Sequence, residues 1–130
     1  YDYDYEDMSL IVFTPNGLSF QATTWFRSER GNWSVTNTKK LVSGDYNDDG
    51  KDELSAMYDY NNEDMALIVF KANGFSFQTS TWFRSGKGNW SVPVTKFVTA
   101  GDYNGDGISE ISSFYDYGRD DMAVLIFKPF

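Results

Sequence analysis

The chain has 130 residues, of which 41% are hydrophobic and 18% aromatic, so it carries enough apolar material to bury a core. Its formal net charge of −8 disfavours nucleic acid as a partner, because phosphate binding requires clustered Lys and Arg. With no Cys and no His, the chain lacks thiol nucleophiles, Cys/His zinc sites and imidazole catalysis. No apolar run reaches the 18 residues or so of a membrane span, and we expect no membrane insertion.

The first element of the chain, Tyr1-Asp2-Tyr3, belongs to a 57-residue repeat. It recurs as Tyr58-Asp59-Tyr60 and as Tyr115-Asp116-Tyr117. Residues 1–57 and 58–114 are identical at 35 positions without a gap. Such similarity indicates tandem copies of one structural unit.

The next elements along the chain are strand-like runs separated by turn signals. Asn16-Gly17 and Asn73-Gly74 predict hairpin turns. The run from Leu54 to Tyr60 alternates in polarity, whereas residues 65–70 are continuously apolar and should be buried on both faces. Further strands are expected at 75–84, 94–102, 110–117 and 122–127.

Each repeat is therefore predicted to form a four-stranded antiparallel meander, the size of a propeller blade, in an all-β fold. Residues 1–43 should form the third and fourth strands of a partial blade and the first strand of the next. Residues 44–100 make a full repeat unit, and residues 101–130 a partial one. Because a propeller ring needs about 4 to 8 blades, we expect an incomplete ring, completed by self-association or by further blades of a parent propeller.

Two loops carry the most specific chemistry in the sequence. Hard Ca²⁺ is bound by six to eight oxygens, which alternate positions of a tight loop can supply. The backbone carbonyls of Lys51 and Ile108 would add a ligand to each site. The candidate ligands are Asp45, Asn47, Asp49, Lys51 and Glu53 in the first loop and Asp102, Asn104, Asp106, Ile108 and Glu110 in the second.

Other interpretations of the two loops are weaker. An acidic, Gly-rich β-turn could exist without an ion, but two copies in the same register favour metal binding. Mg²⁺ tolerates irregular loops poorly, and zinc is disfavoured by ligands that are all oxygen. Ca²⁺ is therefore the predicted cofactor.

The sequence GDYNGDG at 101–107, followed by a strand, Tyr-Asp-Tyr, an apolar strand and a Trp-containing strand leading to Gly-Asn-Trp, resembles the FG-GAP or VCBS-type repeat. Such repeats occur in bacterial extracellular proteins and, more distantly, in integrin α-subunit propellers and integrin-like fungal lectins. The resemblance implies propeller blades with calcium in the loop between the first and second strands. Two positions depart from it: the ninth loop residue is Glu53 or Glu110 where Asp is usual, and Asp48 replaces a usual Gly.

The repeated tryptophans suggest a binding surface. Aromatic rings flanked by Arg and Asn can stack on sugar faces and hydrogen-bond hydroxyl groups. Trp25 and Trp82 lie inside alternating strands and are expected to pack between blades. The candidate glycan-binding residues are Arg27, Asn32 and Trp33 in one copy and Arg84, Asn89 and Trp90 in the next.

Two further patterns resemble functional sites, but we do not interpret them as such. Asn32-Trp33-Ser34 and Asn89-Trp90-Ser91 match the N-glycosylation signal, which we interpret as coincidence. The acidic pairs Glu6-Asp7, Glu63-Asp64 and Asp120-Asp121 could be glycosidase carboxylates, but their presence in every copy favours a structural role. We expect no enzymatic activity.

The sequence therefore predicts a calcium-stabilised, extracellular β-propeller repeat module for binding or adhesion, with carbohydrate as the ligand class. The alternative is a purely structural repeat segment of a larger propeller or of a head-to-tail assembly, with no ligand of its own.

Overall fold

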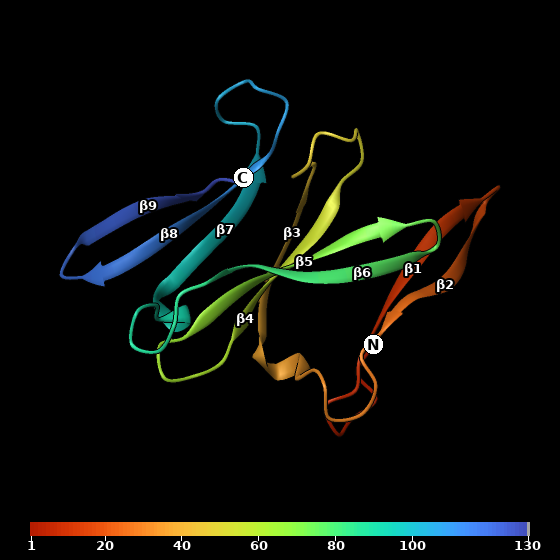
Figure 1. The fold of residues 1–130 in the computed structure, drawn as a ribbon, viewed down its shortest axis with the longest axis horizontal. Helices are drawn as coiled ribbons and strands as arrows, with labels where there is room; N and C mark the ends of the chain where they lie inside the picture. Colours follow the sequence, from red (N-terminus) through yellow and green to blue (C-terminus); the bar gives the residue numbers. More distant parts are fainter. Residues whose placement is uncertain (130) are drawn as a thin grey trace. The chain divides into compact units, whose positions relative to one another are not determined.

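The computed structural model describes residues 1–129 as an all-β chain, which confirms the predicted fold class (Figure 1). The chain forms two compact units, one of residues 1–37 with 71–78 and one of 38–70 with 79–130. The strands are β1 (Ser9–Asn16), β2 (Ser19–Arg27), β3 (Thr38–Gly44), β4 (Glu53–Asp59), β5 (Met65–Asn73), β6 (Ser76–Arg84), β7 (Thr95–Gly101), β8 (Glu110–Gly118) and β9 (Asp121–Phe127). Single 3₁₀ turns, Val35–Asn37 and Val92–Val94, precede β3 and β7.

The strands form antiparallel meanders in which sequence neighbours pair. The sheet orders are β1-β2, β3-β4-β5-β6 and β7-β8-β9. The complete repeat thus contains the predicted four strands, and β7 to β9 repeat the order of β3 to β5 (Figure 1). The predicted propeller-type blade is confirmed at the level of strand number and order.

The β1–β2 hairpin turns one residue later than the Asn-Gly signal suggests. Asn16 pairs with Ser19, so the two turn residues are Gly17 and Leu18. Gly17 has a φ of 63°, which glycine adopts without the steric cost that a Cβ would add. A glycine at the first central position is typical of a type II′ hairpin turn, which suits the twist of the flanking strands.

The core of the second unit lies between its two sheets. Met57, Leu67 and Val69 from β4 and β5 are buried together with Ile111 of β8. Val98, Ala100 and Phe127 of β7 and β9 pack against this cluster. Every residue from Met65 to Phe70 is buried, as the continuous apolar run predicts. Burial of these side chains is the main stabilising contribution that the fold offers.

Candidate metal loops and aromatic turns

The first candidate metal loop joins β3 to β4, where Gly44 pairs with Glu53. The carboxylate of Asp45 accepts the N–H groups of Asn47 at 3.3 Å, Asp49 at 3.2 Å and Gly50 at 2.8 Å. Partial burial raises the pKa of this carboxyl, but the backbone hydrogen bonds outweigh it and hold the pKa below its ordinary value. Asp45 is therefore kept ionised by the turn that it organises.

The second loop joins β7 to β8 and repeats this arrangement at two of the three donors, with Gly105 donating in place of the residue equivalent to Asn47. Asp102 accepts the N–H groups of Gly107 at 2.8 Å, Gly105 at 2.7 Å and Asp106 at 3.1 Å. The bond from Gly107 is the largest cause that lowers the pKa of Asp102, and partial burial opposes it. The carboxylate of Asp106 in turn accepts the N–H of Ile108 at 2.9 Å.

The glutamates at the ninth loop position face the loop itself. Glu53 is 2% exposed and accepts the Tyr46 N–H at 3.0 Å and the amide of Asn47. Glu110 likewise accepts the Tyr103 N–H at 3.0 Å and the Asn104 amide at 2.6 Å. The two glutamates therefore orient the asparagines, a role that the sequence did not indicate.

The donor chemistry of the loops fits a hard cation, since each loop offers carboxylate, amide and carbonyl oxygens. Among residues 1–129, however, no three acidic side chains gather at one point. Asp45 and Asp49 with the oriented Asn47 are the side-chain donors that fit best in the first loop, and Asp102, Asn104 and Asp106 are their equivalents. Direct ligation by Glu53 and Glu110 stays a prediction.

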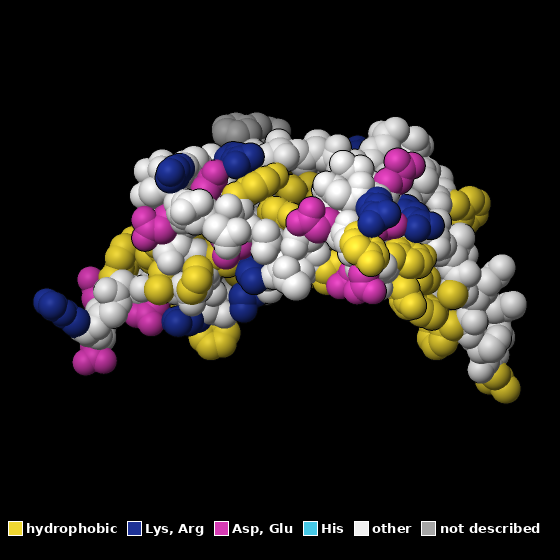
Figure 2. Space-filling view, turned by 90° about the horizontal axis from the view of Figure 1, so that it is seen from below, with side chains coloured by type: hydrophobic (Ala, Val, Ile, Leu, Met, Phe, Trp, Pro, Cys, Tyr) yellow, Lys and Arg dark blue, Asp and Glu magenta, His cyan; other side chains and the backbone are white. Residues whose placement is uncertain are grey.

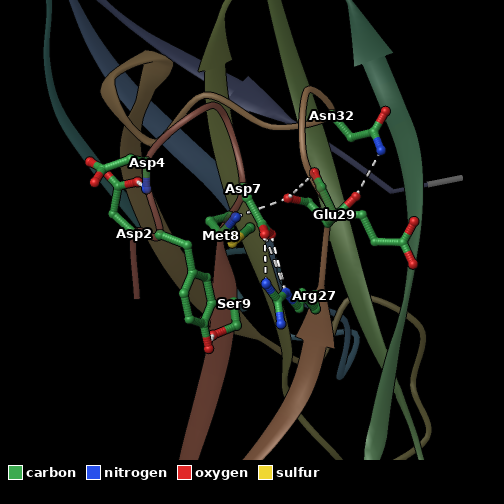
Figure 3. Close-up of polar contacts among 10 residues, drawn as sticks. Asp2, Asp4, Asp7, Met8, Ser9, Arg27, Glu29 and Asn32 are labelled. Carbon is green, nitrogen blue, oxygen red and sulfur yellow. Dashed lines mark hydrogen bonds and ion pairs between the residues drawn. The ribbon is translucent and has the colours of Figure 1, made fainter.

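The predicted sugar-binding arginines lie at the open ends of the β1–β2 and β5–β6 hairpins, opposite the turns. In the first unit, Arg27 Nη2 lies 2.8 Å from an oxygen of Asp7 (Figure 3). The Arg27 guanidinium also stacks 4.3 Å from the Tyr3 ring centre. In the second unit, Arg84 binds Asp64 at 2.8 Å and lies 3.7 Å above Tyr60. The hydrogen bond from each arginine is the main cause that lowers the pKa of its aspartate. Asp7 and Asp64, from the first two acidic pairs, thus have a structural use. A structural role of the third pair, Asp120-Asp121, stays a prediction.

The Gly-Asn-Trp turn of the first repeat is docked by its backbone. The Trp33 N–H donates to the Glu6 carbonyl at 2.9 Å, and the Asn32 amide donates to the Ser28 carbonyl at 3.0 Å. The Trp33 side chain is buried, with 8% of its surface exposed. A sugar could reach this ring only if the turn moved.

The second Gly-Asn-Trp turn is held in the same way. The Asn89 amide donates to the Ser85 carbonyl at 3.0 Å, and Trp90 Nε1 donates to Thr95 Oγ1 at 2.9 Å. The Trp90 ring lies 5.1 Å from Tyr115 and 5.2 Å from Phe127. The candidate glycan residues are thus engaged within the fold, and carbohydrate binding by them stays a prediction.

Trp82 offers a more accessible ring than the turn tryptophans. It is 38% exposed and lines a mostly apolar pocket of about 480 Å³ in the second unit, with Phe83, Phe127 and Lys128 among its neighbours. Figure 2 shows exposed hydrophobic side chains lying among acidic and basic ones on the surface. The sequence predicts that Trp82 packs between blades, and its ring does share the pocket with Ile111 and Phe127 of the neighbouring sheet. The alternating strand gave no signal that the ring would remain partly exposed.

The meander sheets and the loops between their first and second strands define a β-propeller-type repeat module. The chain belongs to the FG-GAP-like repeat family, whose pattern matches residues 45–112 and so includes both loops. No curated protein and no solved structure matches the chain significantly. FG-GAP repeats are a non-enzymatic kind of repeat domain and are typically extracellular. Within residues 1–129, no helix has the length and apolar character needed to cross a membrane.

Proposed function

We propose that this chain is a calcium-stabilised, extracellular repeat module that serves binding or adhesion and catalyses no reaction. The observation that carries the calcium assignment is the twofold occurrence of one arrangement. In both loops an ionised aspartate accepts three backbone N–H groups at the same strand connection. A turn held in this way presents its remaining carboxylate and carbonyl oxygens to a cation at little entropic cost.

Calcium, when bound, would supply positive charge that offsets the repulsion among the loop carboxylates. In the first loop, Asp45, Asn47, Asp49 and the Lys51 carbonyl would hold the ion, with water completing the coordination. Glu53 would act on the ion through Asn47, whose amide nitrogen it binds. The same roles fall to Asp102, Asn104, Asp106, Ile108 and Glu110 in the second loop.

Calcium titration by isothermal calorimetry tests this proposal. We expect two ions per chain in the intact protein and one in either Asp49→Ala or Asp106→Ala, because each change removes a carboxylate from one loop. Ser76→Ala, on the solvent-exposed start of β6, is the control and should leave the stoichiometry at two. Absence of calcium binding to the folded chain would refute the assignment.

Carbohydrate is the ligand class that we propose for the binding role, with the Trp82 ring as the stacking surface. Support comes from its exposure beside a pocket that contains the charged Lys128, since sugar sites combine an aromatic face with a few polar groups. On a glycan array, Trp82→Ala should abolish binding. Thr23→Ala, on the exposed part of β2, is the control and should leave binding unchanged.

The rival to a lectin-like role is a purely structural repeat segment. It predicts no glycan binding by the parent protein, at any calcium concentration, while calcium binding and stability are retained. A negative array with a folded, calcium-loaded chain would therefore favour the structural role over carbohydrate binding.

A further inference from the structure

The two candidate metal loops are joined by a backbone hydrogen bond. The Ser109 N–H donates to the Asp45 carbonyl at 2.7 Å. Asp45 opens the first loop, and Ser109 lies between Ile108 and Glu110 of the second. The strands that lead into the loops, β3 and β7, also lie in contact. The backbone of one candidate site is thus tied directly to the backbone of the other.

The approach of the loops is so close that it requires glycine at position 44. A Cβ on Gly44 would lie 2.8 Å from the Cβ of Ser109 and 2.9 Å from its Oγ. The equivalent Gly101 of the second loop meets only the ring of Tyr103, at 3.4 Å. Gly44 therefore serves the contact between the two loops, and this contact has no counterpart at Gly101.

Asp48 adds an electrostatic link between the loops. Its Oδ1 lies 3.5 Å from the place that a Cβ on Gly107 would take. The equivalent residue in the second loop is Gly105, which carries no charge. The first loop thus places an additional carboxylate beside the turn of the second, where it would favour a cation.

Tyr46 connects the loops through the core as well. It is the second residue of the first loop and is 2% exposed. Its ring belongs to the same buried cluster as Ile111, which directly follows Glu110. Both loops therefore contact the same group of packed side chains, so fixing the position of one loop restricts the side chains next to the other.

We propose that the two loops bind calcium as a coupled pair, in which an ion in one loop raises the affinity of the other. This inference rests on the calcium binding proposed above. An ion in the first loop fixes the Asp45 backbone and, through the hydrogen bond, its partner Ser109. The second loop then loses less conformational entropy when its own ion binds, so its affinity rises. Repulsion between the ions opposes the coupling but is weakened by water and salt around the exposed loops.

Calorimetric titration of single-loop variants tests the coupling. With the second loop silenced by Asp106→Ala, the first loop should bind calcium at least about five-fold more weakly than in the intact chain. Asp49→Ala should weaken the second loop by the same factor, because coupling between two binding equilibria is reciprocal. In the Ser109→Pro background, which removes the N–H donor, both factors should approach one. Ser109→Ala keeps the N–H and should keep the coupling.

The outcomes separate the coupling from calcium binding itself. The intact chain could bind two ions while each loop keeps the same calcium affinity when the other loop is silenced. That result would overturn the coupling and leave the calcium assignment intact. No binding in the intact, folded chain would overturn both. Asp49→Ala and Asp106→Ala alone decide the matter should Ser109→Pro fail to fold, which circular dichroism would reveal.

Discussion

Removal of calcium with a chelator is expected to lower the melting temperature of the chain by about 10 °C or more. A ligand that binds only the folded state stabilises it by about 2.7 kcal/mol per site at a free concentration of 100 times Kd. The first loop alone carries Asp45, Asp48, Asp49, Asp52 and Glu53 against the single positive charge of Lys51. Without a cation these carboxylates repel one another, so chelation should remove a large share of the stability.

Scanning calorimetry with calcium, with EDTA and with magnesium measures this effect. Magnesium should restore little of the stability, because it requires near-ideal octahedral geometry and gives up its water reluctantly. The double variant Asp49→Ala/Asp106→Ala is the control, and its melting temperature should not respond to chelation. Identical melting curves of the parent protein in calcium and in EDTA would count against the assignment.

The strand pattern of the fold could be predicted from the sequence because the same apolar runs and turn signals occur in more than one repeat. The continuous apolar run at 65–70 is buried throughout, and the expected strand at 94–102 is observed as β7, Thr95–Gly101. Turn position was less predictable, since Asn16-Gly17 is shifted by one residue in the register. Gly17 is compatible with either turn, since glycine suits the second position after Asn and also the first position of a type II′ turn.

Contacts between distant segments account for most of what the sequence did not predict. Arg27 and Asp7 are 20 residues apart, and only the fold shows that they meet. The constant spacing of this pair in both repeats was an available signal, because Arg84 and Asp64 are separated equally. No signal in the sequence indicated that Glu53 faces Asn47. An acidic residue at that position is equally compatible with a direct ligand of the ion.

Identical motifs also acquire different environments, which a repeat pattern cannot reveal. Tyr46 and Tyr103 occupy the same loop position, yet Tyr46 is 2% exposed and Tyr103 is 51% exposed. The Tyr46 ring lies in the core cluster of the second unit, 6.4 Å from the Trp82 ring. Its hydroxyl lies 3.2 Å from both the Val42 carbonyl and Ser55 Oγ. Burial raises the pKa of this hydroxyl, so it stays protonated as a donor.

Tyr46→Ala is therefore expected to destabilise the chain by about 3 to 5 kcal/mol, the usual cost of deleting a buried aromatic ring. Tyr103→Ala, its matched control 57 residues later, should cost less than about 1 kcal/mol because the ring is half exposed. Tyr46→Phe keeps the ring and should cost about 1 kcal/mol, since Ser55 Oγ still donates to Val42. Urea unfolding followed by tryptophan fluorescence measures all three. Equal losses of stability for Tyr46→Ala and Tyr103→Ala would contradict the difference in burial between these two tyrosines.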